Sequence, residues 1–140
     1  MNRYGRIIGV DVGTKHVGLA RTDLLRTIAN PIGTYSPDDA FAKLEELART
    51  DQVEKIVVGW PLTPEGKEGA AVEMVEQFLE KLHRILPDME VDKIDERYTS
   101  KEAVQVMVES GVPKMKRRES DRINRAAAAI ILQKYLNLQN

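Results

Sequence analysis

The chain has 140 residues, a formal net charge of −1 from 21 basic and 22 acidic side chains, and 42% hydrophobic and 31% charged residues. These values are typical of a single globular domain over residues 1–140, and they exclude long disordered tracts and a protein-wide basic field for nucleic acid. The chain has no cysteine, which excludes thiol catalysis, disulfides and cysteine-ligated zinc. Because it has neither a signal-peptide pattern nor an apolar run near the roughly 20 residues that span a bilayer, we expect a cytoplasmic protein.

The N-terminal third is predicted to form three strands. Residues 5–12 are a mostly apolar run that carries one acid, Asp11, and residues 16–22 read as its hairpin partner. Gly13, Thr14 and Lys15 fall at the turn. Residues 28–35 are the third expected strand, and Pro31 favours an edge or bulged position there because proline cannot donate to a central ladder.

The middle of the chain alternates helix and strand. Ser36 and Pro37 are typical of a helix start, and Phe41, Leu44, Leu47 and Ala48 share a face of the predicted helix over 36–50. Residues 53–60 predict a buried parallel strand. The next helix is expected over 68–86, with a buried stripe formed by Ala71, Val75, Phe78, Leu82 and Ile85, and the last strand over 89–97.

Two helices are predicted in the C-terminal part. Thr99 with Glu102 forms a capping-box pattern, and Gly111 followed by Pro113 ends the helix that it starts. The final helix begins near Ser120. The order βββαβαβαα therefore predicts an α/β fold with a mixed five-stranded sheet and helices on both faces.

Acidic residues gather where such a sheet binds ligands, which is outside the carboxyl ends of its parallel strands. Asp11 lies late in the first strand, and Asp95 with Glu96 ends the last one. Asp121 and Asn124 open the final helix three residues apart, so they share a helix face. Three clustered carboxylates repel one another, and a divalent cation such as Mg²⁺ removes that cost and supports phosphodiester hydrolysis.

Simpler structural roles remain open for each acid. Instead of binding metal, Asp11 could simply accept hydrogen bonds from backbone donors in the turn. Glu96 could simply pair with Arg97 or a lysine. Asp121 could simply be an acid that the helix dipole favours at the start of a helix.

A local basic segment stands out against the neutral total charge. Residues 113–120, "PKMKRRES", contain Lys114, Lys116, Arg117 and Arg118 immediately before Asp121. A solvated loop explains such a run as well as a phosphate-binding loop does.

Four segments together resemble the bacterial YqgF/RuvX family, the pre-16S rRNA nucleases once called Holliday junction resolvases. They are "GVDVGTKHVGLA" at 9–20, "IVVGWPLTPEGKEGAA" at 56–71, "DERYTSKEA" at 95–103 and "INRAAAAIILQKYL" at 123–136. Their order and spacing match over nearly the whole chain. The resemblance implies a ribonuclease H-like fold and trimming of the 5′ end of precursor 16S rRNA.

The resemblance also implies roles for individual residues. It carries an active-site role onto Asp11 and Glu96, and supporting roles onto Lys15, Arg97 and Thr99. With Mg²⁺ or Mn²⁺ as the metal, Lys15 and Arg97 would stabilise charge developing on the phosphate.

Two positions depart from the family pattern. Asn124 stands where the family usually has an acid, and our hypothesis is that Asp121, one turn earlier, supplies the third carboxylate. Trp60 stands where a smaller apolar residue is common. It could be a core or rim residue or could stack on a base, and we favour a core residue. With the resemblance, the basic loop reads as a phosphate-holding flank of the acid cluster.

Three other functions compete with an RNA nuclease. A Holliday junction resolvase-like DNA endonuclease would act as a symmetric dimer, although the sequence does not decide between monomer and homodimer. A non-catalytic RNA-binding assembly module is an option because Asn124 removes one ligand. Nucleotide binding of the sugar-kinase type is disfavoured, since it needs two such domains.

Overall fold

The computed structural model describes residues 5–62, 65–96 and 120–139. These residues form a five-stranded sheet with the strand order β3-β2-β1-β4-β5. The strands are β1 (Arg6–Val12), β2 (Val17–Thr22), β3 (Ala29–Tyr35), β4 (Val53–Trp60) and β5 (Glu90–Asp95). The first three are antiparallel, whereas β4 pairs in parallel with both β1 and β5. The predicted mixed sheet is therefore confirmed.

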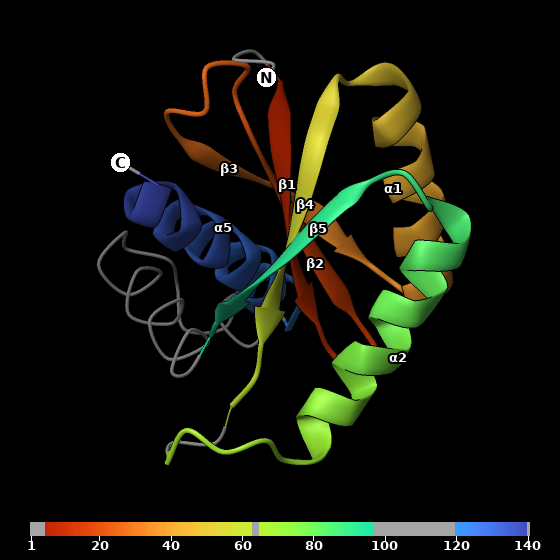
Figure 1. Cartoon of the computed structure of the whole chain (residues 1–140), viewed down its shortest axis with the longest axis vertical. Helices are drawn as coiled ribbons and strands as arrows, with labels where there is room; N and C mark the ends of the chain where they lie inside the picture. The colour runs from red at the N-terminus through yellow and green to blue at the C-terminus, as the bar shows by residue number, and fades with distance from the viewer. Residues whose placement is uncertain (1–4, 63–64, 97–119, 140) are drawn as a thin grey trace.

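Helices cover both faces of the sheet, as expected. Helices α1 (Pro37–Thr50) and α2 (Ala70–Ile85) lie on one face, and α5 (Ser120–Gln139) lies on the other (Figure 1). The predicted start of α1 is confirmed, since the Ser36 hydroxyl accepts a hydrogen bond from the Asp39 N–H at 3.2 Å. The helix predicted after Thr99 and the basic loop fall outside the described residues. No helix in the described part of the chain is long and apolar enough to cross a bilayer.

Each face of the sheet has its own hydrophobic core. Ile8, Val10 and Val12 of β1 pack with the buried faces of α1 and α2, where the rings of Phe41 and Phe78 stack with their centroids 4.6 Å apart. Ile7 packs with α5 on the opposite face. Side chains of successive strand residues point to opposite faces, so the parity of a residue assigns it to one core.

One detail of the α2 stripe was wrong. The buried residues of this helix are Val72, Val75, Phe78 and Leu82, whereas Ala71 is exposed. The helix begins at Ala70, later than the expected start at 68, and Gly69 is its N-cap. Val72 continues the three- and four-residue spacing from Val75, so burial of the larger valine sets the rotation of the first turn.

Strand β3 is an edge strand with a bulge at the predicted place. Leu19 pairs with Gly33 while Ala20 pairs with Pro31, so β3 has one extra residue between these two pairs. Because Pro31 lacks an N–H, this irregular edge position costs no ladder hydrogen bond.

Helix α5 crosses β1 at Gly9 and runs opposite to β4. A Cβ atom at position 9 would lie 2.8 Å from Leu132 Cβ and 2.9 Å from the Ala128 carbonyl oxygen, so only glycine permits this close approach. Ile131 lies against Gly59 late in β4, and Tyr135, four residues later, contacts Lys55 early in β4. The first turns of α5 therefore lie towards the carboxyl ends of β1 and β4.

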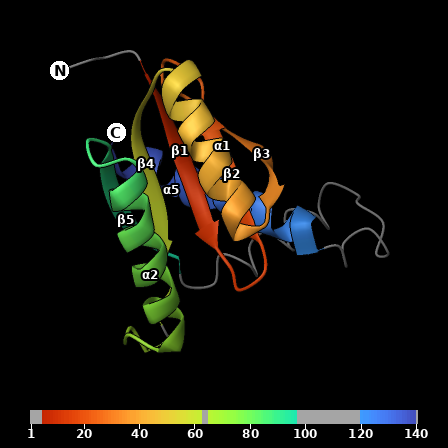
Figure 2. The same cartoon turned by 90° about the vertical axis from the view of Figure 1, so that its right-hand side faces the viewer.

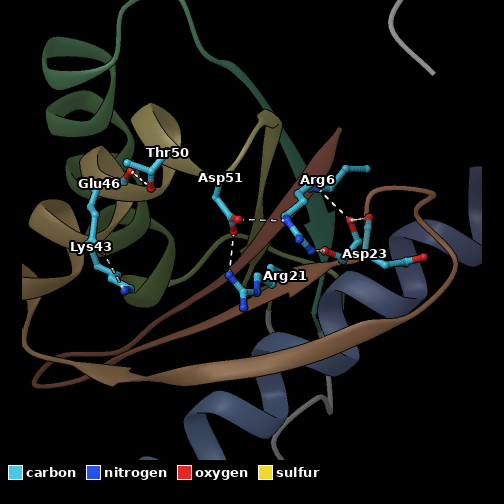
Figure 3. A network of polar contacts seen from close by, with 9 residues as sticks. Arg6, Arg21, Asp23, Lys43, Glu46, Thr50 and Asp51 are labelled. Atoms are coloured by element: carbon cyan, nitrogen blue, oxygen red, sulfur yellow. Dashed lines mark hydrogen bonds and ion pairs between the residues drawn. The ribbon is translucent and has the colours of Figure 1, made fainter. Parts of the chain in front are cut away.

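Polar networks tie the helices to the opposite end of the sheet. Asp51, the C-cap of α1, lies 3.2 Å from Arg6 Nε and accepts from Arg21 Nη1 at 2.7 Å (Figure 3). On the α5 face, Lys55 Nζ donates to the Tyr135 hydroxyl at 2.7 Å, and that hydroxyl donates to Asp92 at 2.6 Å. These contacts fix α1 and α5 on the sheet at a distance from the acids discussed next.

Candidate active site

Asp11 and Glu96 come together at the carboxyl edge of the sheet, although 84 positions separate them in the chain. Asp11 is the last but one residue of β1, and Glu96 directly follows β5. Strand β4 lies between these two strands. The two side chains are hydrogen-bonded to each other on the α5 face of the sheet. Two strand ends thus form one carboxylate pair.

Gly59 of β4 makes room for this pair. A Cβ atom at position 59 would lie 2.7 Å from both Cδ and Oε2 of Glu96, and 2.8 Å from Ile131 Cδ1. The Glu96 backbone N–H also donates to the Trp60 carbonyl at 3.1 Å, which anchors the residue beside the end of β4. The glutamate carboxylate therefore spans the bare backbone of β4 to reach Asp11.

Two buried carboxyl groups in contact repel each other when both are ionised. Burial, followed by the negative charge of Asp11, raises the pKa of Glu96 from 4.5 to about 9. Burial also raises the pKa of Asp11, against the hydrogen bond from Glu96, which lowers it. At neutral pH Glu96 therefore holds a proton, and the hydrogen bond that raises the pKa of Glu96 while lowering that of Asp11 places this proton between the two carboxyl groups. A bound cation could replace that proton.

Asp95 and Trp60 lie on the other side of the sheet. Strand alternation directs both away from α5, and they are paired in register on β5 and β4. Trp60 packs against the α1–α2 core, with Lys93 Nζ 4.1 Å from its ring centroid. Trp60 is half-buried, so it packs at the edge of this core rather than inside it. The negative charge of Asp95 also raises the pKa of Glu96.

The turn after β1 projects beyond the acid pair. The Gly13 N–H donates to the His16 carbonyl at 2.9 Å, and a Cβ atom at position 13 would lie 2.6 Å from that oxygen. Thr14, Lys15 and His16 are exposed at the tip. Lys15 is therefore a solvent-accessible cation four residues after Asp11 along the chain.

The proposed third acid lies in the first turns of α5. Asn124 precedes Ile131 by seven residues, or about two helical turns, and Asp121 lies one turn before that. The antiparallel course of α5 directs this end of the helix towards the carboxyl edge. The side chains of Asp121 and Asn124 are outside the described residues.

The remaining candidates also lie outside the described residues. They are Arg97, Thr99, Lys114, Lys116, Arg117 and Arg118. Among the described residues, no three His, Cys, Asp or Glu side chains form a group that could hold a metal ion. Of the predicted site residues, the structure therefore describes the side chains of Asp11, Glu96 and Lys15.

Gly59 is the site residue that sequence reasoning missed. Its signal was present, because a glycine inside an apolar strand often marks the close approach of another group. The sequence does not show which strand neighbours β4 on each side, and hence which side chain fills the space.

Comparisons with known proteins place the chain in a family. The family model RuvX, described as Holliday junction resolvase, matches residues 5–138. A protein of Salinibacter ruber named "Putative pre-16S rRNA nuclease" is 48% identical over 98% of this chain and 96% of its own. One of the same name from Chlorobium luteolum is 38% identical over 97% and 96%.

Solved structures match the fold at low sequence identity. Thermus thermophilus RuvC in complex with a Holliday junction substrate aligns with a TM-score of 0.62 and 16% identity, covering 98% of both chains. A second structure of Thermus thermophilus RuvC gives a TM-score of 0.56 over 96% of both chains, also at 16% identity. This likeness confirms the ribonuclease H-like fold expected from the sequence. On the strength of the family model and of relatives that match along almost their whole length, the chain belongs to the RuvX family of nucleases.

Proposed function

We propose that this protein is a metal-dependent nuclease that hydrolyses phosphodiester bonds in precursor 16S rRNA near its 5′ end. The observation that carries the proposal is the Asp11–Glu96 pair at the carboxyl edge, one carboxylate at the end of each of two strands. The names of the curated relatives support the substrate. A cytoplasmic location and a single domain over 1–140 are parts of the same proposal.

The donor set fits a hard divalent cation. Mg²⁺ and Mn²⁺ prefer carboxylate and carbonyl oxygens, and two adjoining carboxylates that otherwise share a proton gain most from a dication. Asp11 and Glu96 would hold it, with Asp121 and the neutral oxygen of Asn124 completing the set. When bound, the cation would supply charge neutralisation and a nucleophilic water at neutral pH.

The remaining residues would handle the substrate. Lys15, on the exposed turn, and Arg97, next to Glu96, would offset the negative charge that builds on the phosphate during attack. Thr99 would donate to a phosphate oxygen. The basic residues Lys114, Lys116, Arg117 and Arg118 would hold the backbone of the strand without reading its sequence.

A cleavage assay tests this function directly. Precursor rRNA fragments and four-way DNA junctions are incubated side by side with Mg²⁺, with Mn²⁺ or with a chelator, and Asp11→Asn serves as the inactive control. We expect cleavage of the RNA that needs the metal and is lost in Asp11→Asn. Binding of RNA without cleavage under all conditions would instead identify a non-catalytic assembly module.

A second candidate is a Holliday junction resolvase-like DNA endonuclease. The solved RuvC complex with a Holliday junction supports it, because the fold matches over nearly the whole chain. Such an enzyme cuts two strands in concert and acts as a homodimer, whereas the RNA nuclease needs only a monomer. Preferential cleavage of the junction, by a protein that sediments as a dimer, would favour this alternative.

A further inference from the structure

An apolar groove lies on the far side of the carboxyl edge from the acid pair. It has a volume of about 240 Å³ and lies between α1 and α2, which pack side by side on this face (Figure 2). Phe41, Phe78 and Met74 form its apolar wall, and Thr14, Gln77 and Lys81 form its polar rim. Both phenylalanines are only 6% exposed, so this wall is held rigidly by the core.

Residues that line the groove follow the candidate active-site residue Asp11 directly in the sequence. Val12 and Gly13, which line it, directly follow Asp11. Successive strand residues point to opposite faces of the sheet. The Asp11 side chain therefore lies on the α5 face with Glu96, whereas the Val12 side chain lies on the groove side. The exposed turn over residues 13–16 is the ridge between them. A nucleic-acid strand bound at the acid pair would cross this ridge, where Lys15 lies exposed, to reach the groove.

The chemistry of the groove suits a flat heteroaromatic group better than a phosphate. Its wall is apolar, and the cation on its rim, Lys81, already lies 3.5 Å from the Asp38 carboxylate. Gln77 can donate and accept, and the Asp38 carboxylate can accept, which matches the mixed edge of a nucleobase. The volume lies below the roughly 300–1,000 Å³ typical of sites for drug-sized ligands, so one planar ring system fits and a folded chain does not.

Charge around the groove favours a polyanion carrying that group. Lys81 Nζ lies 4.8 Å above the Phe41 ring and 3.5 Å from Asp38, whose side chain is 91% exposed. Lys81 therefore lies on the rim of the groove, and Lys15 is exposed on the turn whose residues Gly13 and Thr14 line it. Phosphates on either side of an inserted base would meet these cations, while the base meets the apolar wall.

We propose that the groove binds one unpaired base of the nucleic-acid strand whose phosphate is held at the Asp11–Glu96 pair. This inference rests on the proposed nuclease function and adds that the substrate is single-stranded on one side of the cut. Base contacts of this kind are tolerant of sequence, because every base has an apolar face.

Methionine-methyl NMR of the full-length protein tests the groove without relying on cleavage. The Met74 methyl signal is assigned by its loss in Met74→Leu. We expect the chemical shift of this signal to change when adenosine monophosphate, guanosine monophosphate or a short single-stranded RNA is added. Inorganic phosphate should leave it unchanged. Gln77→Trp, which fills the groove, should abolish the shift and weaken RNA binding at least about fivefold.

His83→Trp is the matched control, because His83 is exposed on the same helix and does not line the groove. It should keep both the shift and the affinity. Metal-dependent cleavage combined with a Met74 signal that no nucleotide moves would overturn the inference and leave the proposed function standing. A nucleotide-dependent Met74 shift in a protein that cleaves nothing would support base binding in the groove and overturn the proposed nuclease function. Equal losses in Gln77→Trp and His83→Trp would also overturn the inference.

Discussion

The carboxylate of Glu96 occupies the space where any residue other than glycine at position 59 would place its Cβ atom. That Cβ would lie 2.7 Å from Glu96 Oε2, which is closer than real contacts allow. The glutamate, anchored at its N–H to Trp60, reaches Asp11 only because β4 is bare at this point.

Gly59→Ala should damage activity more than stability. The atoms that the new methyl group meets are the ends of two flexible side chains, Glu96 and Ile131, which can move aside. We expect a loss of about 1 kcal/mol in unfolding free energy. The displaced carboxylate should cost about a hundredfold in cleavage rate.

Denaturant unfolding and the cleavage assay measure the two effects. Gly33→Ala is the matched control, because the atom nearest to its Cβ would be the Tyr35 hydroxyl oxygen, at 3.3 Å on the edge strand. It should change neither quantity appreciably. Wild-type cleavage by Gly59→Ala would mean that the Glu96 carboxylate does not need its observed position.

Gly9→Ala should have the opposite balance and mainly destabilise the fold. Here the methyl group would meet the Leu132 Cβ and the Ala128 backbone carbonyl, neither of which can rotate away. We expect α5 to shift and the unfolding free energy to fall by about 1–3 kcal/mol, measured by urea unfolding. A fully stable Gly9→Ala protein would contradict the close contact between β1 and α5.

Stability without metal should depend on pH through Glu96. Its pKa is about 9 in the folded protein and ordinarily 4.5, so between these values the folded state holds a proton that the unfolded chain releases. Stability contributed by this group is therefore full below about pH 4.5 and is lost as the pH rises towards 9. Glu96→Gln should flatten this slope and stabilise the protein at pH 8 by about 1–2 kcal/mol while abolishing cleavage.

Urea unfolding at pH 5, 7 and 9 in a chelator measures this slope. Glu45→Gln, at an exposed position of α1, is the control and should retain the wild-type slope. If Glu96→Gln unfolds with the same pH dependence as the wild type, the two carboxylates do not share a proton.

Asp121→Ala should abolish metal-dependent cleavage if Asp121 supplies the third carboxylate. Asn124→Asp adds a charged oxygen one turn later on the same helix and should lower the metal concentration needed for activity. Metal titration of the cleavage rate measures both effects. The hypothesis is wrong if Asp121→Ala cleaves normally while Asp11→Ala is inactive.

Neutralising Lys114, Lys116, Arg117 and Arg118 to glutamine should weaken RNA binding and flatten its dependence on salt. Each phosphate contact that is lost removes about one unit from the slope of log affinity against log salt, or about 0.7 for single strands. Fluorescence anisotropy at several salt concentrations measures this slope. Arg49→Gln with Arg84→Gln, on the exposed surfaces of α1 and α2, is the control and should leave the slope unchanged. Unchanged binding by the fourfold variant would exclude a role for the loop.

Much of the fold could be predicted because it follows from local patterns. The Ser36 cap, the Pro31 edge position and the apolar run of β4 each reflect a preference of a few neighbouring residues, and each is confirmed. The start of α2 was missed, because Ala71 and Val72 both fit a helical stripe and only packing against the sheet chooses the valine. Such choices depend on the partner surface, which periodicity does not contain.

For the site, the sequence by itself determined the residue types and their order. It singled out Asp11 and Glu96 as acids at strand ends, and the RuvX family as their setting. Only the tertiary structure decided that β4 lies between those strands, that Gly59 leaves space for Glu96, and that burial raises the pKa of both carboxyl groups. The physical reason is that strand adjacency and desolvation arise from contacts between segments far apart in the chain, whereas sequence patterns report local preferences.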